Sequence, residues 1–224
     1  AVILTHAHND HSGLIPKLIK RGFSGPIYTT HETTELCSIM LPDSGHIQEM
    51  EVERKNRKLA RANAALLEPI YTAQDGIDAI KSFIPVNYHE SVLVTKNISA
   101  EFNDAGHILG SAHVVVTVTE SSKKTRIVFS GDIGTADQPY IEDPTIIDEA
   151  DIIIMETTYG DRVREDKANR IDLFANAINN AYSKGGNVII PAFAVERTQD
   201  LLFYLHKLQT EKRIPVMPIY IDSP

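Results

Sequence analysis

The stretch Thr5-His6-Ala7-His8-Asn9-Asp10-His11 decides the fold. It comes directly after the apolar residues 1–4, which we expect to end a strand, and directly before a predicted helix over residues 12–21. Because residues two apart in an extended backbone point to the same side, His6 and His8 share one face, and Asp10 and His11 follow on the turn. Imidazole and carboxylate groups are the usual protein ligands of zinc. The stretch therefore predicts a metal site, since a histidine-rich surface loop would need neither the strand nor the helix.

Two later glycine-flanked motifs supply the further ligands that a site for two metal ions needs. His107 lies in DAGHILG (residues 104–110), at a predicted turn between strands, and Asp132 lies in SGDIG (residues 130–134), after an apolar strand. Taken alone, each would more often be an ordinary turn residue. A carboxylate, however, can bridge two metal ions about 3.5–4 Å apart. Because both motifs occur in the same chain as the histidine-rich stretch, we interpret His107 and Asp132 as ligands.

The pattern along the chain favours an α/β fold, because apolar and β-branched runs alternate with segments of helical periodicity. Helices are expected over residues 12–21, from His31, over 44–66, and from Thr72, where a capping sequence begins a helix that Pro85 would close. Strands are expected over residues 26–30, 91–95, 98–102, 112–119, 125–129 and 152–155. The last is wholly apolar, which predicts burial on both of its faces.

A second unit is predicted after Gly160. Helices over residues 168–183 and 198–208 alternate there with strands over 188–190 and 217–221, a series of the doubly wound kind. We therefore expect a domain boundary near residue 161. Both ends of the chain lie in strand-like runs, so we expect the chain to be part of a longer protein.

Composition narrows the functional classes. With 22 basic and 30 acidic residues the formal charge is −8, the wrong sign for binding nucleic acid by bulk charge alone. There is no run of about 18 apolar residues, so no membrane partner is expected. The single cysteine, Cys37, excludes an internal disulfide, suits a reducing compartment such as the cytoplasm, and is interpreted as a small buried hydrophobe.

The ordered series of histidines and aspartates resembles the metallo-β-lactamase superfamily. Three further motifs resemble its β-CASP branch, which contains RNA-processing nucleases and a few DNA-repair nucleases: ETTYGD (156–161), PAFAVERTQ (191–199) and YIDSP (220–224). The resemblance covers essentially the whole chain. It implies a truncated metallo-β-lactamase αββα sandwich as the catalytic domain over residues 1–160. It also implies the start of an inserted, doubly wound β-CASP domain over residues 161–224.

The resemblance further implies roles for the matching residues. His6, His8 and His107 would hold one zinc ion, Asp10 and His11 a second, and Asp132 would bridge the two. Asp10 would also accept a proton from the attacking water, and Glu156 would orient a histidine that protonates the leaving group. That histidine and one more zinc ligand lie downstream of residue 224 in the family.

Two positions depart from the family pattern. Val163 and Arg164 stand where a histidine is often found, and Glu196 stands where glycine is usual. Glu196 would place an acid at a turn that is normally bare, which puts substrate affinity in doubt if that turn lies near the nucleic acid.

We therefore expect a zinc-dependent nuclease that hydrolyses phosphodiester bonds, in RNA rather than single-stranded DNA, with a hydroxide held between two zinc ions. Two alternatives stay open: a small-molecule hydrolase of the same fold, and an inactive scaffold subunit of an RNA-processing complex. The sequence also leaves open whether the enzyme is an endonuclease or an exonuclease, and whether it forms a homodimer.

Two weaker signals have competing interpretations. The basic cluster at residues 54–58 and Arg61 could follow phosphates, or it could form a solvated helix face paired with Glu49, Glu51 and Glu53. His113 lies in an alternating strand and is interpreted as a structural histidine.

Overall fold

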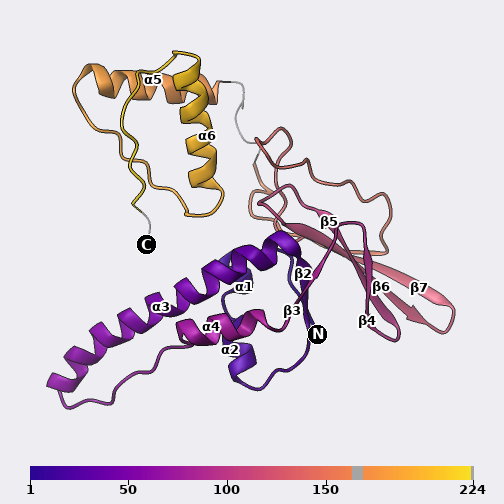
Figure 1. Ribbon diagram of the computed structural model, residues 1–224. Helices are drawn as coiled ribbons and strands as arrows, with labels where there is room; N and C mark the ends of the chain where they lie inside the picture. Colours follow the sequence, from indigo (N-terminus) through magenta and orange to yellow (C-terminus); the bar gives the residue numbers. More distant parts are fainter. Residues whose placement is uncertain (163–168, 223–224) are drawn as a thin grey trace. The chain divides into compact units, whose positions relative to one another are not determined.

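The computed structural model describes residues 1–162 and 169–222 (Figure 1). The chain divides into two compact units, Ala1–Glu156 and Thr157–Pro224, here called unit 1 and unit 2. Unit 1 contains strands β1 Val2–Ile3, β2 Ile27–Thr30, β3 Phe83–Val86, β4 Ser91–Thr95, β5 Ile98–Asp104, β6 Ala112–Glu120, β7 Lys123–Phe129 and β8 Ile152–Ile154. Its helices are α1 Asn9–Ser12, α2 Ile15–Lys20, α3 His31–Arg61 and α4 Ala73–Ile80.

Two sheets make up unit 1. Strands β1, β2 and β3 form a parallel sheet in that order, and β4 to β8 form a second sheet that is antiparallel except for the parallel pair β7 and β8. The sheets pack against each other, because Ile3 and Tyr28 of the first contact the buried cluster that includes Phe102 and Val114 of the second. This core is the middle of the predicted sandwich, and the α/β fold is confirmed.

The helices of unit 1 cover the other face of the small sheet. Helix α3 packs on β2, β3 and α4, and α2 packs on α4. Thr30 caps α3, and Thr72 with Asp75 forms the predicted capping box of α4. Residues 31–61 form one helix rather than a separate helix over 44–66, because α3 continues through Pro42. The predicted helix over 12–21 is two short helices, with Asp10 and His11 in the first.

Two predictions for unit 1 were wrong in part: where the helix after Thr72 ends, and how far β8 is buried. Pro85 does not close α4 but lies in β3, a strand that was not predicted; β3 is at the edge of its sheet, where proline is tolerated. β8 was predicted to be buried on both faces, yet its three isoleucines are 47–62% exposed. The reason is that β8 lies at the edge of its sheet and pairs only with β7.

Unit 2 is helical in its described residues. Helices α5 Arg170–Ser183 and α6 Arg197–Thr210 confirm the two predicted helices, and they pack together through Ile178, Leu205 and Leu208. The strands predicted over 188–190 and 217–221 do not form; these segments find no strand partner among the described residues, and apart from the half-buried Met217 their apolar side chains are exposed. Val163 and Arg164 lie outside the described residues. Within the part of the chain that is described, no helix is long and apolar enough to cross a membrane.

Candidate metal centre

The loop from β1 to α1 carries His6 and His8, and contacts from both ends hold it in place. The carbonyl oxygen of Thr5 accepts a hydrogen bond from the backbone N–H of Ala112, at the start of β6 (2.8 Å). The buried Ser12 hydroxyl, in α1, donates to the carbonyl oxygen of the residue between the two histidines (2.7 Å). These two hydrogen bonds therefore hold the extended backbone that carries the side chains of His6 and His8.

The loop between β5 and β6 presents His107. The hydroxyl oxygen of buried Ser111 accepts hydrogen bonds from the backbone N–H groups of His107 and Ile108 (3.0 and 3.1 Å). Gly106 has a φ of +60°, a conformation that favours glycine, and a Cβ there would lie 2.6 Å from Pro144. The glycine before the histidine is thus required by the backbone of this loop.

The segment after β7 brings Asp132 close to the same loop. The N–H of Gly134 donates to the carbonyl oxygen of Ala105 (2.8 Å). A Cβ at position 134 would lie 1.5 Å from the carbonyl oxygen of Gly106, so no side chain fits there. The SGDIG motif therefore needs glycine at position 134, because the backbone of this segment lies directly against the backbone of the His107 loop.

Glu156, which follows β8, lies beside this segment. Its Oε1 accepts a hydrogen bond from the N–H of Ile133 (2.8 Å), and its own N–H donates to the Ser130 hydroxyl oxygen (3.0 Å). These two bonds flank Asp132 in sequence, so Glu156 holds the backbone around that residue. The catalytic role predicted for Glu156 involves a histidine outside these 224 residues and stays a prediction.

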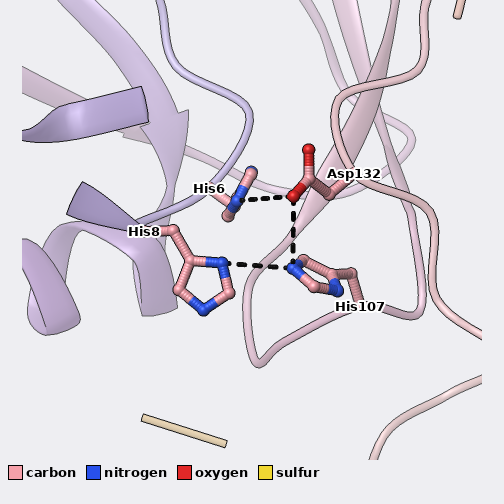
Figure 2. A group of neighbouring side chains, drawn as sticks. All are labelled: His6, His8, His107 and Asp132. Atoms are coloured by element: carbon pink, nitrogen blue, oxygen red, sulfur yellow. Dashed lines mark hydrogen bonds and ion pairs between the residues drawn. The ribbon is translucent and has the colours of Figure 1, made fainter. Parts of the chain in front are cut away.

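Four of the six predicted ligands form one cluster. His6, His8, His107 and Asp132 each offer a ligand atom, and these atoms lie within 4.8 Å of one another (Figure 2). Asp132 Oδ2 lies 3.8 Å from His6 Nε2 and 3.6 Å from His107 Nε2. His8 Nδ1 lies 3.1 Å from His107 Nε2. The four ligand atoms are therefore close enough together to bind a single metal ion.

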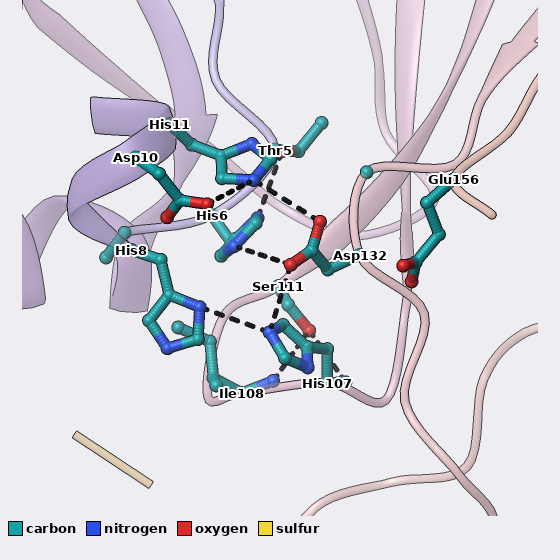
Figure 3. Close-up of polar contacts among 12 residues, drawn as sticks. Thr5, His6, His8, Asp10, His11, His107, Ile108, Ser111, Asp132 and Glu156 are labelled. Atoms are coloured by element: carbon teal, nitrogen blue, oxygen red, sulfur yellow. Dashed lines mark hydrogen bonds and ion pairs between the residues drawn. The ribbon is translucent and has the colours of Figure 1, made fainter. Parts of the chain in front are cut away.

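The other two predicted ligands adjoin the four-residue cluster beside His6, and the centroid of the His11 ring is 4.1 Å from that of His6. His11 Nε2 is 3.3 Å from Asp132 Oδ1 and 3.6 Å from Asp10 Oδ2 (Figure 3). The two oxygens of Asp132 therefore face different groups, one toward the four-residue cluster and one toward His11. The Asp10 side chain is 78% exposed, so it lies open to solvent at the edge of the site.

The electrostatics of the cluster fit a metal ion. His6 is fully buried, and its Nε2 has no hydrogen-bond partner among the described residues, which is costly for a buried polar atom. Burial, together with the neighbouring histidines, lowers the pKa of His6 to about 2. Burial also lowers the pKa values of His8 and His107. All three rings are thus neutral near pH 7, the form that binds a metal.

Several supporting residues were not predicted. The Thr5 hydroxyl lies 3.1 Å from His6 Nδ1, and a threonine beside the ligand was visible in the motif. Thr30 and Thr33 donate their hydroxyls to the carbonyl oxygen of Gly110 (2.7 and 2.9 Å) and so tie α3 to the His107 loop. Nothing local in the sequence signals these contacts, because the partners are 77–80 residues apart.

A family model described as the metallo-beta-lactamase superfamily matches residues 1–175. This chain belongs to the metallo-β-lactamase superfamily. The matched region contains both sheets of unit 1 and all six predicted ligands.

Curated relatives within the superfamily match essentially the whole chain. Ribonuclease TTHA0252 of Thermus thermophilus is 35% identical over 100% of this chain and 46% of its own length. The Integrator complex subunit 11 homolog of Dictyostelium discoideum is 32% identical over 99% of this chain and 28% of its own length. Probable RNase MJ4 of Methanocaldococcus jannaschii is 32% identical over 99% and 47%. These relatives are β-CASP proteins, as the motifs indicated, and the chain spans less than half the length of each.

Proposed function

We propose that this chain carries the catalytic part of a zinc-dependent nuclease that hydrolyses phosphodiester bonds in RNA. The supporting observation is the cluster of His6, His8, His107 and Asp132, in which the buried Nε2 of His6 has no hydrogen-bond partner among the described residues. Two relatives that match the full chain carry the names ribonuclease and RNase, which favours RNA as the substrate class. Residues 1–160 would form the catalytic domain and residues 161–224 the start of a β-CASP domain.

The ligands divide between two zinc ions. His6, His8 and His107 would hold the first, Asp10 and His11 the second, and Asp132 would contribute one oxygen to each, in keeping with Oδ2 lying near His6 and His107 and Oδ1 near His11. Bound there, zinc would lower the pKa of water for attack on a phosphorus atom and neutralise charge on the phosphate oxygens.

Two acidic side chains would complete the chemistry. Asp10 is the most exposed carboxylate of the site, so it is placed to accept a proton from the water that attacks the substrate. Glu156 holds the backbone on both sides of Asp132 and, by the family resemblance, would orient the histidine that protonates the leaving sugar oxygen. Both roles can be tested by substitution of the carboxylate concerned.

The decisive experiment compares Asp132→Ala with Asp148→Ala in the full-length protein, purified without chelators. Asp148 is an exposed aspartate in the segment between β7 and β8 and serves as the matched control. We expect two zinc ions per chain by elemental analysis in the wild type and the control, and one or none in Asp132→Ala. Cleavage of a labelled 20-nucleotide single-stranded RNA should fall by at least about a hundredfold in Asp132→Ala only, the scale of a lost electrostatic contributor.

Three results would contradict the proposal. A folded, zinc-free wild type would remove the ligand assignment and favour a scaffold role. Equal cleavage by both variants would remove Asp132 from the site. Hydrolysis of a β-lactam or an ester, without cleavage of RNA or of a DNA strand of the same sequence, would favour a small-molecule hydrolase.

A further inference from the structure

Within unit 1, the C-terminal part of α3 extends beyond α4, alongside the chain segment that returns from it (Figure 1). This part carries the basic cluster whose role the sequence left open. In the structure the cluster separates into two groups. Lys55 pairs with Glu51 (3.2 Å) and Arg57 pairs with Glu53 (2.7 Å), so two of its cations are neutralised along the helix.

The remaining cations, Arg54, Lys58 and Arg61, form what we call the basic stripe. They are exposed, and none forms an ion pair with any residue that the structure describes. Their spacing of four and three residues places them on one face of the helix. These three cations, unpaired among the described residues, thus gather on one face of a chain whose formal charge is −8.

The basic stripe lies opposite the side on which α3 packs. Val52, Asn56 and Leu59 are half-buried, and at 3.6 residues per turn the stripe is roughly 140–200° around the helix from Asn56. The Asn56 side chain makes two hydrogen bonds with the backbone of Leu67 (both 2.8 Å), which hold the returning segment against the helix. The stripe is therefore presented outward on a braced helix.

The same helix begins at the metal centre. Thr30 and Thr33, at its first turn, bind the carbonyl oxygen of Gly110 in the His107 loop. With a rise of 1.5 Å per residue, the stripe lies roughly 35–45 Å along α3 from that turn. A strand stacked as in a duplex, at about 3.4 Å per nucleotide, covers this span in roughly 10–13 nucleotides, and a more extended strand needs fewer.

We propose that the basic stripe binds the phosphate backbone of a single RNA strand whose scissile bond lies at the metal centre. This inference rests on the proposed function. The stripe offers guanidinium and ammonium groups to phosphates without reading base sequence, and its distance from the metal centre makes it a site for long substrates only.

The test compares two double variants of the full-length protein: Arg54→Gln with Lys58→Gln in the stripe, and Lys55→Gln with Arg57→Gln beside it. Both remove two positive charges from the same helix. Binding of a fluorescent 20-nucleotide RNA is measured by anisotropy in EDTA, which prevents cleavage, at several salt concentrations. We expect the stripe variant to bind about tenfold more weakly with a salt slope smaller by roughly 1.4, and the control to change by less than twofold.

A second arm measures cleavage with zinc present. The stripe variant should lose kcat/KM for the 20-nucleotide RNA but match the wild type on a tetranucleotide, which cannot reach from the metal centre to the stripe. Equal binding losses in the two double variants would overturn the proposal, since bulk charge alone would then explain them. Unchanged RNA binding, or loss only of binding to vesicles of anionic lipid, would also overturn it.

The two proposals fail separately. If the stripe variant binds RNA normally while Asp132→Ala still abolishes cleavage, the stripe inference is wrong and the proposed nuclease stands. If the wild type cleaves no RNA, the proposed function fails and the stripe inference falls with it.

Discussion

The peptide bond between Gly106 and His107 is held at both of its ends. The carbonyl oxygen of Gly106 accepts a hydrogen bond from Gln138 Nε2 (2.9 Å), and the N–H of His107 donates to the Ser111 hydroxyl oxygen (3.0 Å). The orientation of this peptide sets the direction in which the imidazole leaves the loop. We therefore expect Gln138→Ala to weaken zinc binding about tenfold, as loss of an outer partner of a ligand does.

Chelator competition measures that change directly. The matched control is Gln74→Ala, since Gln74 is an exposed glutamine on α4 whose side chain donates a hydrogen bond to Asp78 of the same helix. The metal-free thermal midpoint should be the same for Gln138→Ala and the wild type. A lowered midpoint with unchanged zinc affinity would show that Gln138 supports the fold rather than the ligand.

Cys37 is fully buried in α3, and burial raises the pKa of its thiol to about 12 from an ordinary value near 9. At pH 8 the folded thiolate fraction is thus about a thousandfold below that of the unfolded chain. A disulfide reagent such as DTNB should label the denatured protein at once and the folded protein only as it unfolds. Because the folded pKa is the higher one, stability should also fall as the pH rises above about 9. Rapid labelling of the folded protein at pH 8 would contradict this prediction.

At this scale the sequence indicated which side chains gather in the candidate site, but not the contacts that support their backbone. The predicted ligands His107 and Asp132 lie in short motifs that need glycine at Gly106 and Gly134. Thr30 and Gln138 act on backbone carbonyls that only the finished fold brings to them, 80 and 32 residues away. No pattern in the neighbourhood of either residue indicates its partner.

Among the elements, α6 begins at a strained turn. Glu196 has φ +71° and ψ −66°, and the N–H of Arg197 donates to the carbonyl oxygen of Val195 (3.0 Å), which together define a γ-turn of the rare, strained class. Burial, with Asp200 nearby, also raises the pKa of the Glu196 carboxyl. The family's usual glycine would adopt this turn without strain.

We expect Glu196→Gly to stabilise α6 by about 1 kcal/mol relative to Glu196→Ala, because alanine keeps the Cβ that causes the strain. Both variants remove the carboxyl, so their difference isolates the backbone. Hydrogen exchange of the α6 amides reports on this helix alone. Equal protection in the two variants would mean that the turn relaxes without cost.

The element predictions succeeded where the signal was local and failed where a strand needed a neighbour. The capping box at Thr72 and the periodicity of α5 and α6 depend on nearby residues, and these helices formed as expected. β3 was not predicted because proline, here Pro85, is disfavoured inside a strand. It is tolerated in an edge strand, but the sequence does not show that β3 lies at an edge. The apolar runs at 188–190 and 217–221 have the composition of strands, but no described segment pairs with them.

At the scale of the whole of unit 1, the candidate metal centre lies where loops from the two sheets meet. His6 and His8 follow β1 of the small sheet, whereas His107 and Asp132 follow β5 and β7 of the large sheet. In the metal-free protein, packing and a few hydrogen bonds hold these loops together. They must offset the free-energy cost of burying the polar imidazole rings beside one another. A metal that binds all four residues binds the folded state and not the unfolded chain, so it must raise stability.

Removal of zinc should therefore destabilise the full-length protein. At free zinc a hundredfold above its dissociation constant, the expected loss on chelation is about 2.7 kcal/mol per independent site. Thermal unfolding with zinc and with EDTA measures it as a drop in the midpoint of the transition that includes unit 1. Asp132→Ala should show a much smaller drop than the wild type, and Asp148→Ala the full drop, because only the former loses a ligand that connects the sheets. If zinc is bound yet the midpoint is the same with and without EDTA, the ion binds folded and unfolded chains alike. The four residues would then be a surface chelate rather than the junction between the two sheets.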